Sequence, residues 1–375
     1  MPALLPDIDP DGLQEFSVVF TDRSLNHMSR RFQEVMRDIS TILKEVYNAD
    51  AVALVPGGGT YAMESVARQL VGGEKALVIR NGFFSYRWSQ IFDAGAIPAS
   101  HEVLMARQSG NEPEAPFAPA PIGEVATRIH AEAPAVVFAP HVETASGMIL
   151  PDDYLQTVAE ATHAAGGLFV LDCIASGAAW VDMKAVGVDV LISAPQKGWS
   201  ASPSAGMVML NDAAKARVEA RQSSSFALDL KKWLSIMQAY EAGGHAYHAT
   251  MPTDALKHLR DVMQETRDWG FENARAAQWE LGRSVRALLA ERGLKSVAAE
   301  GFGAPGVVVS YTNDPGVQNG SKFAAAGVQI AAGVPLMCDE PASYSSFRLG
   351  LFGLDKLKDV PGTVARIKAA LDAAL

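Results

Sequence analysis

Cysteines, runs of basic residues and long apolar stretches are all scarce in this sequence. Its 375 residues include only two cysteines, Cys173 and Cys338, so no disulfide framework holds the fold. The net charge is −10 at pH 7 and no segment holds a run of lysine or arginine, which argues against a nucleic-acid or anionic-membrane surface. The most apolar stretch, residues 166–181, carries Asp172 in its middle and is too short to span a bilayer.

The first residues also lack the layout of a secretory signal. The stretch MPALLPDIDPDG is acidic and rich in proline, whereas a signal peptide begins with positive charge and continues with an apolar run. With 32 glycines and 20 prolines the chain is not collagen-like or of low complexity, and a hydrophobic fraction of 49% excludes disorder. We therefore expect a globular, enzyme-sized protein of the cytoplasm.

What the chain does contain is an alternation of strand and helix patterns between residues 50 and 210. Continuous apolar runs are typical of strands buried on both faces, and segments of helical period lie between them. The strand-like runs are residues 51–55, 75–80, 135–139, 167–172 and 189–193. The helical segments are residues 60–71, 83–94 and 152–165. This order predicts an α/β fold with a mainly parallel sheet and helices on both faces.

After residue 212 the pattern changes to helices separated by short strands. The expected helices are residues 228–241, 253–288 with a break near Gly270, and 355–375. The expected strands are residues 306–311, 328–331 and 346–351. We expect an N-terminal segment and a large domain over residues 1–254, and a smaller α+β domain over residues 255–375.

The first predicted strand runs into a glycine turn that opens a helix. Gly58, Gly59 and Thr60 lie in this turn, where free backbone N–H groups and the helix dipole favour an anion such as phosphate. The same letters fit the G-x-G-x-x-A dinucleotide pattern. However, the next strand ends at Arg80 rather than at an acidic residue, so an NADP-dependent reductase stays open as an alternative.

Two titratable residues follow later predicted strands. Asp172 ends a buried apolar run, where an unpaired carboxylate costs on the order of several kcal/mol. Lys197 comes just after another run, and a buried lysine near a cation has a lowered pKa, which suits an amine nucleophile. Alone, each would be a helix cap or a loop lysine. Together they meet two demands of pyridoxal phosphate, a carboxylate for the pyridine nitrogen and a lysine for the imine.

With the glycine turn as a phosphate site, the chain resembles the class V aminotransferases of the fold-type I pyridoxal phosphate enzymes. The resemblance is to the alanine–glyoxylate and serine–glyoxylate (serine–pyruvate) aminotransferase group in particular, and it runs from about residue 27 to the C-terminus. It rests on short motifs in the family's order: GGT at 58–60, NGFF at 81–84, HVET at 141–144, DCIAS at 172–176, QK at 196–197, YHATMP at 247–252 and FRLGL at 347–351. It implies a large domain with a mainly parallel, seven-stranded sheet and a smaller α+β C-terminal domain.

The resemblance also implies which residues bind pyridoxal 5′-phosphate. They are Gly58, Gly59 and Thr60 at the phosphate, Phe84 and Ile174 on the two ring faces, Thr144 at the phenolic oxygen, Asp172 at the pyridine nitrogen, and Gln196 beside the imine-forming Lys197. Tyr247 and Thr250 are expected to reach the phosphate of the neighbouring subunit, which implies a homodimer with shared active sites. Arg348 is expected to bind the substrate carboxylate through two parallel hydrogen bonds.

The activity implied is transfer of an amino group from a small amino acid, of the alanine or serine type, to a 2-oxo acid such as glyoxylate or pyruvate. Lys197 would then also move the proton at the substrate Cα. The sequence departs from the family in residues 16–29, which lack its glycine–proline loop and contain Arg23 as a candidate for a second anionic group. The identity of the substrates is therefore left open.

Two other readings concern Cys338 and a histidine pair. Cys338 lies ten residues before Arg348, where a desulfurase or lyase of the same superfamily carries its nucleophile, so that activity is the alternative. Gln196 argues against it, because a histidine commonly precedes the lysine in those enzymes. His245 and His248 are three residues apart, but no acidic or cysteine partner accompanies them, so we expect no metal.

Overall fold

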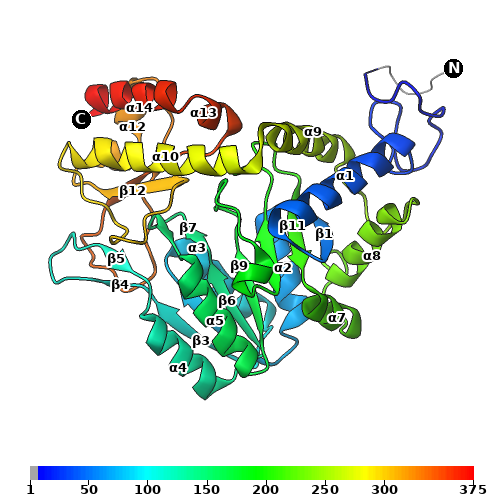
Figure 1. Cartoon of the computed structure of the whole chain (residues 1–375), viewed down its shortest axis with the longest axis horizontal. Coiled ribbons are helices and arrows are strands. Elements are labelled where there is room, and N and C mark those ends of the chain that lie inside the picture. Colours follow the sequence, from blue (N-terminus) through cyan, green and yellow to red (C-terminus); the bar gives the residue numbers. More distant parts are fainter. Residues whose placement is uncertain (1–6) are drawn as a thin grey trace.

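A seven-stranded sheet forms the centre of the chain in the computed structural model, which describes residues 7–375 (Figure 1). Its order is β1-β11-β10-β9-β6-β2-β3. The strands are β1 (Ala51–Pro56), β2 (Lys75–Arg80), β3 (Ser100–Met105), β6 (Val136–Pro140), β9 (Leu168–Asp172), β10 (Val190–Ser193) and β11 (Ala205–Leu210). Strand β11 runs antiparallel to both neighbours, whereas the remaining neighbouring pairs are parallel. The predicted α/β fold with a mainly parallel sheet is confirmed.

Helices cover this sheet on both faces. Every residue of β9 is buried, and since successive side chains point to opposite faces, neither face of this strand meets water. Helix α2 packs on β11, α3 on β2 and α5 on β9, while α1 and α8 pack on β1. The helices of this part are α1 (Arg30–Tyr47), α2 (Gly59–Leu70), α3 (Phe83–Gly95), α4 (Ile122–Glu132), α5 (Asp152–Ala164), α6 (Met183–Val186), α7 (Asp212–Ala220) and α8 (Leu230–Glu241).

The sequence did not predict helices α1, α4, α6 and α7 or strands β3 and β11. Strand β3 is an edge strand in which only Leu104 is buried, and it therefore lacks a continuous apolar run. Strand β11 reads AGMVML, with one β-branched residue only. Helix α1 does carry a readable signal, because Phe32, Val35, Met36 and Ile39 are buried at helical spacing.

A smaller antiparallel sheet of order β12-β14-β13 lies in the C-terminal part. Helix α10 packs between it and α14 in Figure 1. The elements are α9 (Thr253–Trp269), α10 (Phe271–Ala290), β12 (Val307–Tyr311), α11 (Pro315–Gln318), α12 (Ser321–Ala325), β13 (Ala331–Ala332), β14 (Ser346–Gly350), α13 (Leu354–Lys358) and α14 (Val360–Ala374). The division of the chain after residue 254 remains a prediction.

Three details of the C-terminal part refine the sequence expectations. The break near Gly270 is present, and its φ of +101° is one that side-chain-bearing residues rarely adopt. The strand expected at residues 328–331 is only the pair Ala331–Ala332. The helix expected at 355–375 is split at Asp359, because Pro361 in the first turn of α14 cannot donate a hydrogen bond to the preceding turn.

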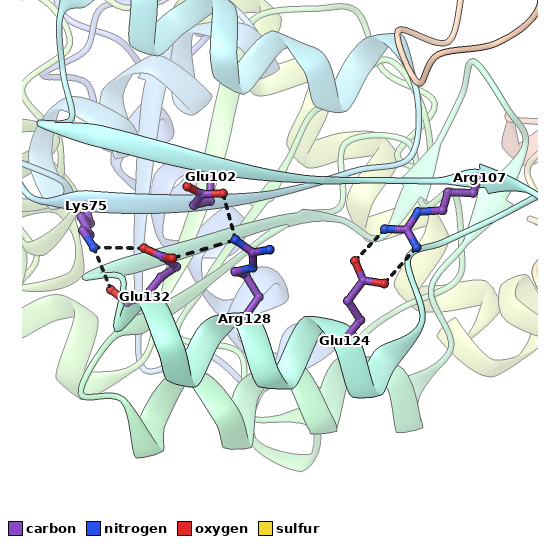
Figure 2. Close-up of polar contacts among 6 residues, drawn as sticks. All are labelled: Lys75, Glu102, Arg107, Glu124, Arg128 and Glu132. Atoms are coloured by element: carbon purple, nitrogen blue, oxygen red, sulfur yellow. Dashed lines mark hydrogen bonds and ion pairs between the residues drawn. The ribbon is translucent and has the colours of Figure 1, made fainter.

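Ion pairs join α4 to strands β2 and β3 of the large sheet and to Arg107, which follows β3 (Figure 2). They are Arg107–Glu124 at 2.6 Å, Lys75–Glu132 at 3.0 Å and Arg128–Glu102 at 3.6 Å. Exposed pairs of this kind contribute about 0–1 kcal/mol each, so these contacts add little to the stability of the fold.

Residues 7–375 contain no helix that is both long enough and apolar enough to cross a membrane. The acidic, proline-rich start of the chain lies partly outside the described residues.

Four further two-residue strands complete the fold. They are β4 (Arg107–Gln108), β5 (Phe117–Ala118), β7 (Val142–Glu143) and β8 (Met148–Ile149).

Candidate active site

The segments that follow β1, β2, β6, β9 and β10 lie together at the carboxyl ends of these strands. The carboxyl ends of parallel strands lie on the same side of a sheet, and ligands of open α/β sheets bind there. The backbone N–H of His141, after β6, donates to the carbonyl oxygen of Asp172 in β9 at 2.9 Å. A β-carbon built on Gly59, after β1, would lie 2.4 Å from Cδ1 of Ile174, after β9. The predicted motifs are therefore neighbours in space.

Asp172 is buried at the end of β9, between β6 and β10 in the sheet. Its Oδ1 accepts a hydrogen bond from the backbone N–H of Ile174 at 2.9 Å. Burial raises the pKa of Asp172 to about 7, and the nearby Glu143 acts in the same direction, while Arg87 and Lys197 oppose it. A cation placed against this carboxylate would favour its ionised form.

Lys197 lies in the turn after β10 and is half-buried. Its Nζ stands 5.3 Å from the centroid of the Phe352 ring. Burial and the positive charge of Arg348 lower the pKa of Lys197 below its ordinary value. The turn lies against the loop after β9, since a β-carbon on Gly198 would stand 2.3 Å from the carbonyl oxygen of Gly177. Glycine is therefore required directly after this lysine.

The glycine turn precedes α2 in the conformation that an anion site needs. Gly58 is extended, and its carbonyl oxygen accepts the N–H groups of Tyr61 and Ala62. A β-carbon on Gly58 would meet no atom within 4 Å, whereas one on Gly59 would collide with Ile174. The turn thus faces open space at Gly58 and is tightly packed at Gly59, with the amino-terminal end of a helix behind it.

Glu143 is a fully buried carboxylate that the sequence reasoning did not single out. It accepts hydrogen bonds from the backbone N–H groups of Phe84 at 3.2 Å, Ser85 at 2.8 Å and Ala145 at 2.9 Å. A β-carbon on Gly82 would lie 2.6 Å from its Cγ. Glu143 therefore joins the start of α3 to the segment that carries the buried Thr144. A glutamate in the HVET motif was the available signal.

Two guanidinium groups lie near the ring of Phe84. Arg348, on β14 of the C-terminal sheet, has its Cζ 5.5 Å from the ring centroid, and Arg87, on α3, has its Cζ 5.4 Å from it. The Nε of Arg348 donates to the carbonyl oxygen of Ala332 at 2.8 Å. Burial lowers the pKa of Arg348. Arg87 was not predicted, although its position three residues after Phe84 on a helix places it on the same face.

Comparison with known proteins gives the family. The family model described as aminotransferase class-V matches residues 13–301, which is more than half of the chain. The chain belongs to the class V aminotransferase family. This confirms the resemblance drawn from the motifs, and with it pyridoxal 5′-phosphate as the cofactor.

Individual relatives differ in substrate. Alanine–glyoxylate aminotransferase of Rattus norvegicus is 28% identical over 73% of this chain and 64% of its own length. The chain thus spans less than two thirds of that relative. The 2-aminoethylphosphonate–pyruvate transaminase of Burkholderia pseudomallei (strain 668) is 28% identical over 86% of this chain and 84% of its own length.

Solved structures share the fold. Alanine–glyoxylate aminotransferase from Nostoc sp. superposes with a TM-score of 0.76 at 22% identity, covering 92% of this chain and 88% of that protein. Aspartate aminotransferase of subgroup IV from Thermus thermophilus also reaches 0.76, at 25% identity and 94% coverage of both chains. The expected fold-type I architecture is confirmed.

The residues present fit pyridoxal phosphate. The buried carboxylate of Asp172 accepts only one hydrogen bond among the described residues, so a cationic ring nitrogen would supply a partner that the fold does not. The glycine turn offers N–H groups and open space at Gly58 for a phosphate. A lysine with a lowered pKa, Lys197, is close enough to Asp172 for the two charges to influence each other.

Four of the predicted site residues lie at the surface, and one of them, Thr60, accepts a hydrogen bond from Nη1 of Arg87 at 3.0 Å. Gln196 is exposed beside Lys197. Tyr247 and Thr250 are exposed as well, and their hydroxyl groups lie 3.0 Å apart. The ring of Tyr247 packs 5.5 Å from that of His27. Arg23 is also exposed, and its backbone N–H donates to Thr21.

Cys338 and the histidine pair have surroundings of their own. The Cys338 thiol is buried and lies 3.5 Å from the carbonyl oxygen of Arg80; burial raises its pKa to about 12. A thiolate nucleophile would need the opposite shift. The Nε2 of His248 lies 2.8 Å from the carbonyl oxygen of Phe226, while His245 packs edge-on against His27. Within residues 7–375, no group of three or more potential metal-ligating side chains lies together.

Proposed function

We propose that this class V aminotransferase moves an amino group from a small amino acid of the alanine or serine type to a 2-oxo acid such as glyoxylate or pyruvate. The observation that carries the proposal is the meeting of Asp172, Lys197 and Arg348 at one edge of the sheet, with Phe84 against the Arg348 guanidinium. The names of the rat and Burkholderia relatives support amino transfer to a 2-oxo acid.

Pyridoxal phosphate, when bound, supplies an electron-accepting ring joined to the substrate's amino nitrogen. Lys197 would hold the cofactor, and its amine, once free, would take the proton from the substrate Cα and return it. The lowered pKa of Lys197 suits this work, because a larger share of the amine is neutral near pH 7. Asp172 holds the protonated ring nitrogen through charge and hydrogen bonding.

Three other side chains fix the geometry in this proposal. Phe84 and Ile174 would hold the cofactor ring between them. Arg348 binds the substrate carboxylate with its two Nη groups, while its Nε is held by the carbonyl oxygen of Ala332. Orienting the Cα–H bond in this way removes conformational freedom before the proton moves.

We also propose that the active sites are shared in a cytoplasmic homodimer. Tyr247 and Thr250 are exposed and point their hydroxyl groups at one another, as a preformed pair that a second copy's phosphate can reach. Leu13 and Phe16 are each 88% exposed, which leaves apolar surface on the N-terminal segment for a second copy to cover.

A panel of donors and acceptors tests the activity. Purified protein is mixed with alanine, serine or 2-aminoethylphosphonate and with pyruvate or glyoxylate, and the visible absorbance of the bound cofactor and the new amino acid are measured. We expect alanine or serine to change the absorbance and to form product with glyoxylate or pyruvate. Lys197→Ala should form no product. If 2-aminoethylphosphonate alone reacts, the proposed donor class is wrong.

Mixing inactive variants tests the shared sites. A Lys197→Ala chain and a Tyr247→Ala/Thr250→Ala chain are unfolded and refolded together. A mixed dimer would have one intact site, so random pairing restores about a quarter of wild-type activity. No recovery above that of the separate variants would contradict sharing.

A further inference from the structure

The glycine turn of the cofactor site carries no positive side chain of its own. Residues 56–64 read PGGGTYAME, so the one charged side chain within this segment is that of Glu64, which is negative. A helix amino terminus provides the equivalent of roughly half a positive charge, whereas a phosphate monoester carries about −1.5 to −2 at pH 7. The turn and the start of α2 alone would leave most of the phosphate charge without compensation.

Arg87 reaches this turn from α3. Its Nη1 donates a hydrogen bond to Oγ1 of Thr60 at 3.0 Å, and its guanidinium lies 5.4 Å from the centre of the Phe84 ring. The side chain therefore touches both the residue expected at the phosphate and the residue expected on the cofactor ring. Its positive charge also acts to lower the pKa of Lys197 and, against the larger effect of burial, that of Asp172. Arg87 therefore lies near both of these groups.

Arg87 has no acidic partner among residues 7–375, since no carboxylate there lies within 4.0 Å of its nitrogen atoms. Arg68 on α2, which is half-buried like Arg87, offers a contrast because its Nη2 lies 2.7 Å from Glu64. Arg68 already has its counterion. The guanidinium of Arg87 therefore lies beside the phosphate turn with a full positive charge and no counterion among the described residues. It has five N–H donors, and the hydroxyl of Thr60 accepts a hydrogen bond from one of them.

We propose that Arg87 binds the phosphate group of pyridoxal phosphate from within the same protomer, together with the glycine turn and Thr60. This inference rests on the cofactor site described under the proposed function, and goes beyond it by assigning the main positive charge of the phosphate site. Two parallel N–H groups of a guanidinium match two phosphate oxygens, and the hydrogen bond to Thr60 holds the side chain at the turn.

Binding of two cofactor forms tests the proposal. Full-length wild type, Arg87→Gln and Arg87→Lys are freed of cofactor and titrated with pyridoxal 5′-phosphate and with pyridoxal, which lacks the phosphate. Visible absorbance and quenching of tryptophan fluorescence report binding. Arg68→Gln is the matched control, because it removes a half-buried guanidinium from a neighbouring helix.

We expect Arg87→Gln to weaken binding of pyridoxal phosphate by about tenfold to a hundredfold and binding of pyridoxal by less than about threefold. Arg87→Lys should fall between wild type and Arg87→Gln, since a point charge attracts phosphate without matching its geometry. Arg68→Gln should keep the wild-type ratio of the two affinities. If Arg87→Gln does not fold, the same ratio measured in Arg87→Lys decides.

An equal loss of affinity for both forms would mean that Arg87 only supports the fold, and would overturn the proposal. Unchanged cofactor affinity with a raised KM for the amino donor would overturn it too, and would place Arg87 on the substrate instead. Wild-type protein that binds neither form is the different result that contradicts the proposed function itself.

Discussion

The buried carboxylate of Glu143 accepts the backbone N–H of Phe84 at 3.2 Å, and this contact fixes where the aromatic ring stands. The same carboxylate accepts from the backbone N–H of Ser85 at 2.8 Å and from its Oγ at 2.7 Å. The first N–H groups of a helix have no partner within the helix, and its positive end favours an anion. Glu143 therefore anchors α3 and, with it, both Phe84 and Arg87.

Replacing Glu143 should destabilise the protein strongly. Glu143→Ala leaves several buried donors without an acceptor, at roughly 1–3 kcal/mol each, so we expect the free energy of unfolding to fall by about 3 kcal/mol or more. Chemical denaturation measures this. Glu132→Ala, which breaks an exposed ion pair, is the control and should cost no more than about 1 kcal/mol. Equal effects of the two substitutions would show that Glu143 does not anchor the helix.

Asp172 should make the stability of the cofactor-free chain depend on pH. Burial raises its pKa from 3.8 to about 7, so ionisation costs more in the folded chain than in the unfolded one. Its stabilising contribution is therefore complete below about pH 4 and is lost as the pH rises through about 7. The difference in free energy of unfolding between wild type and Asp172→Asn should decrease by up to about 4 kcal/mol over that window.

Denaturation of both chains at a series of pH values measures this difference. The contributions of the other titrating groups are common to both chains and therefore cancel. Added pyridoxal phosphate should reduce the pH dependence, because a cationic ring nitrogen stabilises the ionised carboxylate. A difference that stays constant from pH 4 to pH 8 would mean that Asp172 titrates normally.

Arg348 should be needed for substrates that carry a carboxylate. Two charge-assisted hydrogen bonds contribute roughly 1.5–3 kcal/mol each, so Arg348→Ala should lower kcat/KM for alanine or serine by at least about a hundredfold. Arg348→Lys should recover only part of the loss. Steady-state kinetics with each donor measure the effect, and cofactor affinity should be unchanged. Near-wild-type efficiency in Arg348→Ala would mean that the carboxylate is bound elsewhere, and exposed Arg23 would be examined next.

Cys338 should be dispensable for amino transfer. With a pKa of about 12, its thiol is roughly 10⁵-fold more abundant than its thiolate at pH 7, too little thiolate for a nucleophile. Cys338→Ser should therefore keep kcat/KM within about twofold of wild type for the amino donor. Incubation with cysteine should release no sulfide. Sulfide release that disappears in Cys338→Ser would instead establish the desulfurase alternative.

The sequence by itself determined the mainly parallel character of the large sheet and five of its seven strands, and it predicted site residues where those strands end. Buried parallel strands require continuous apolar runs, and the runs that end at Asp172 and precede Lys197 are local features that a single segment displays. The ordered motifs around them were sufficient to recognise the family. Strand β3 was not predicted because an edge strand is partly exposed to water and does not need a continuous apolar run.

Only the tertiary structure decided which residues share the site across distant segments. Glu143 and Phe84 are 59 residues apart, and Arg87 and Thr60 are 27 apart, so no local period relates them. The raised pKa of Cys338 likewise depends on the burial of its thiol, which the residue type does not predict. Hydrogen bonds and pKa values depend on distances and desolvation, and both are set when the strand ends and the C-terminal sheet come together in the folded chain.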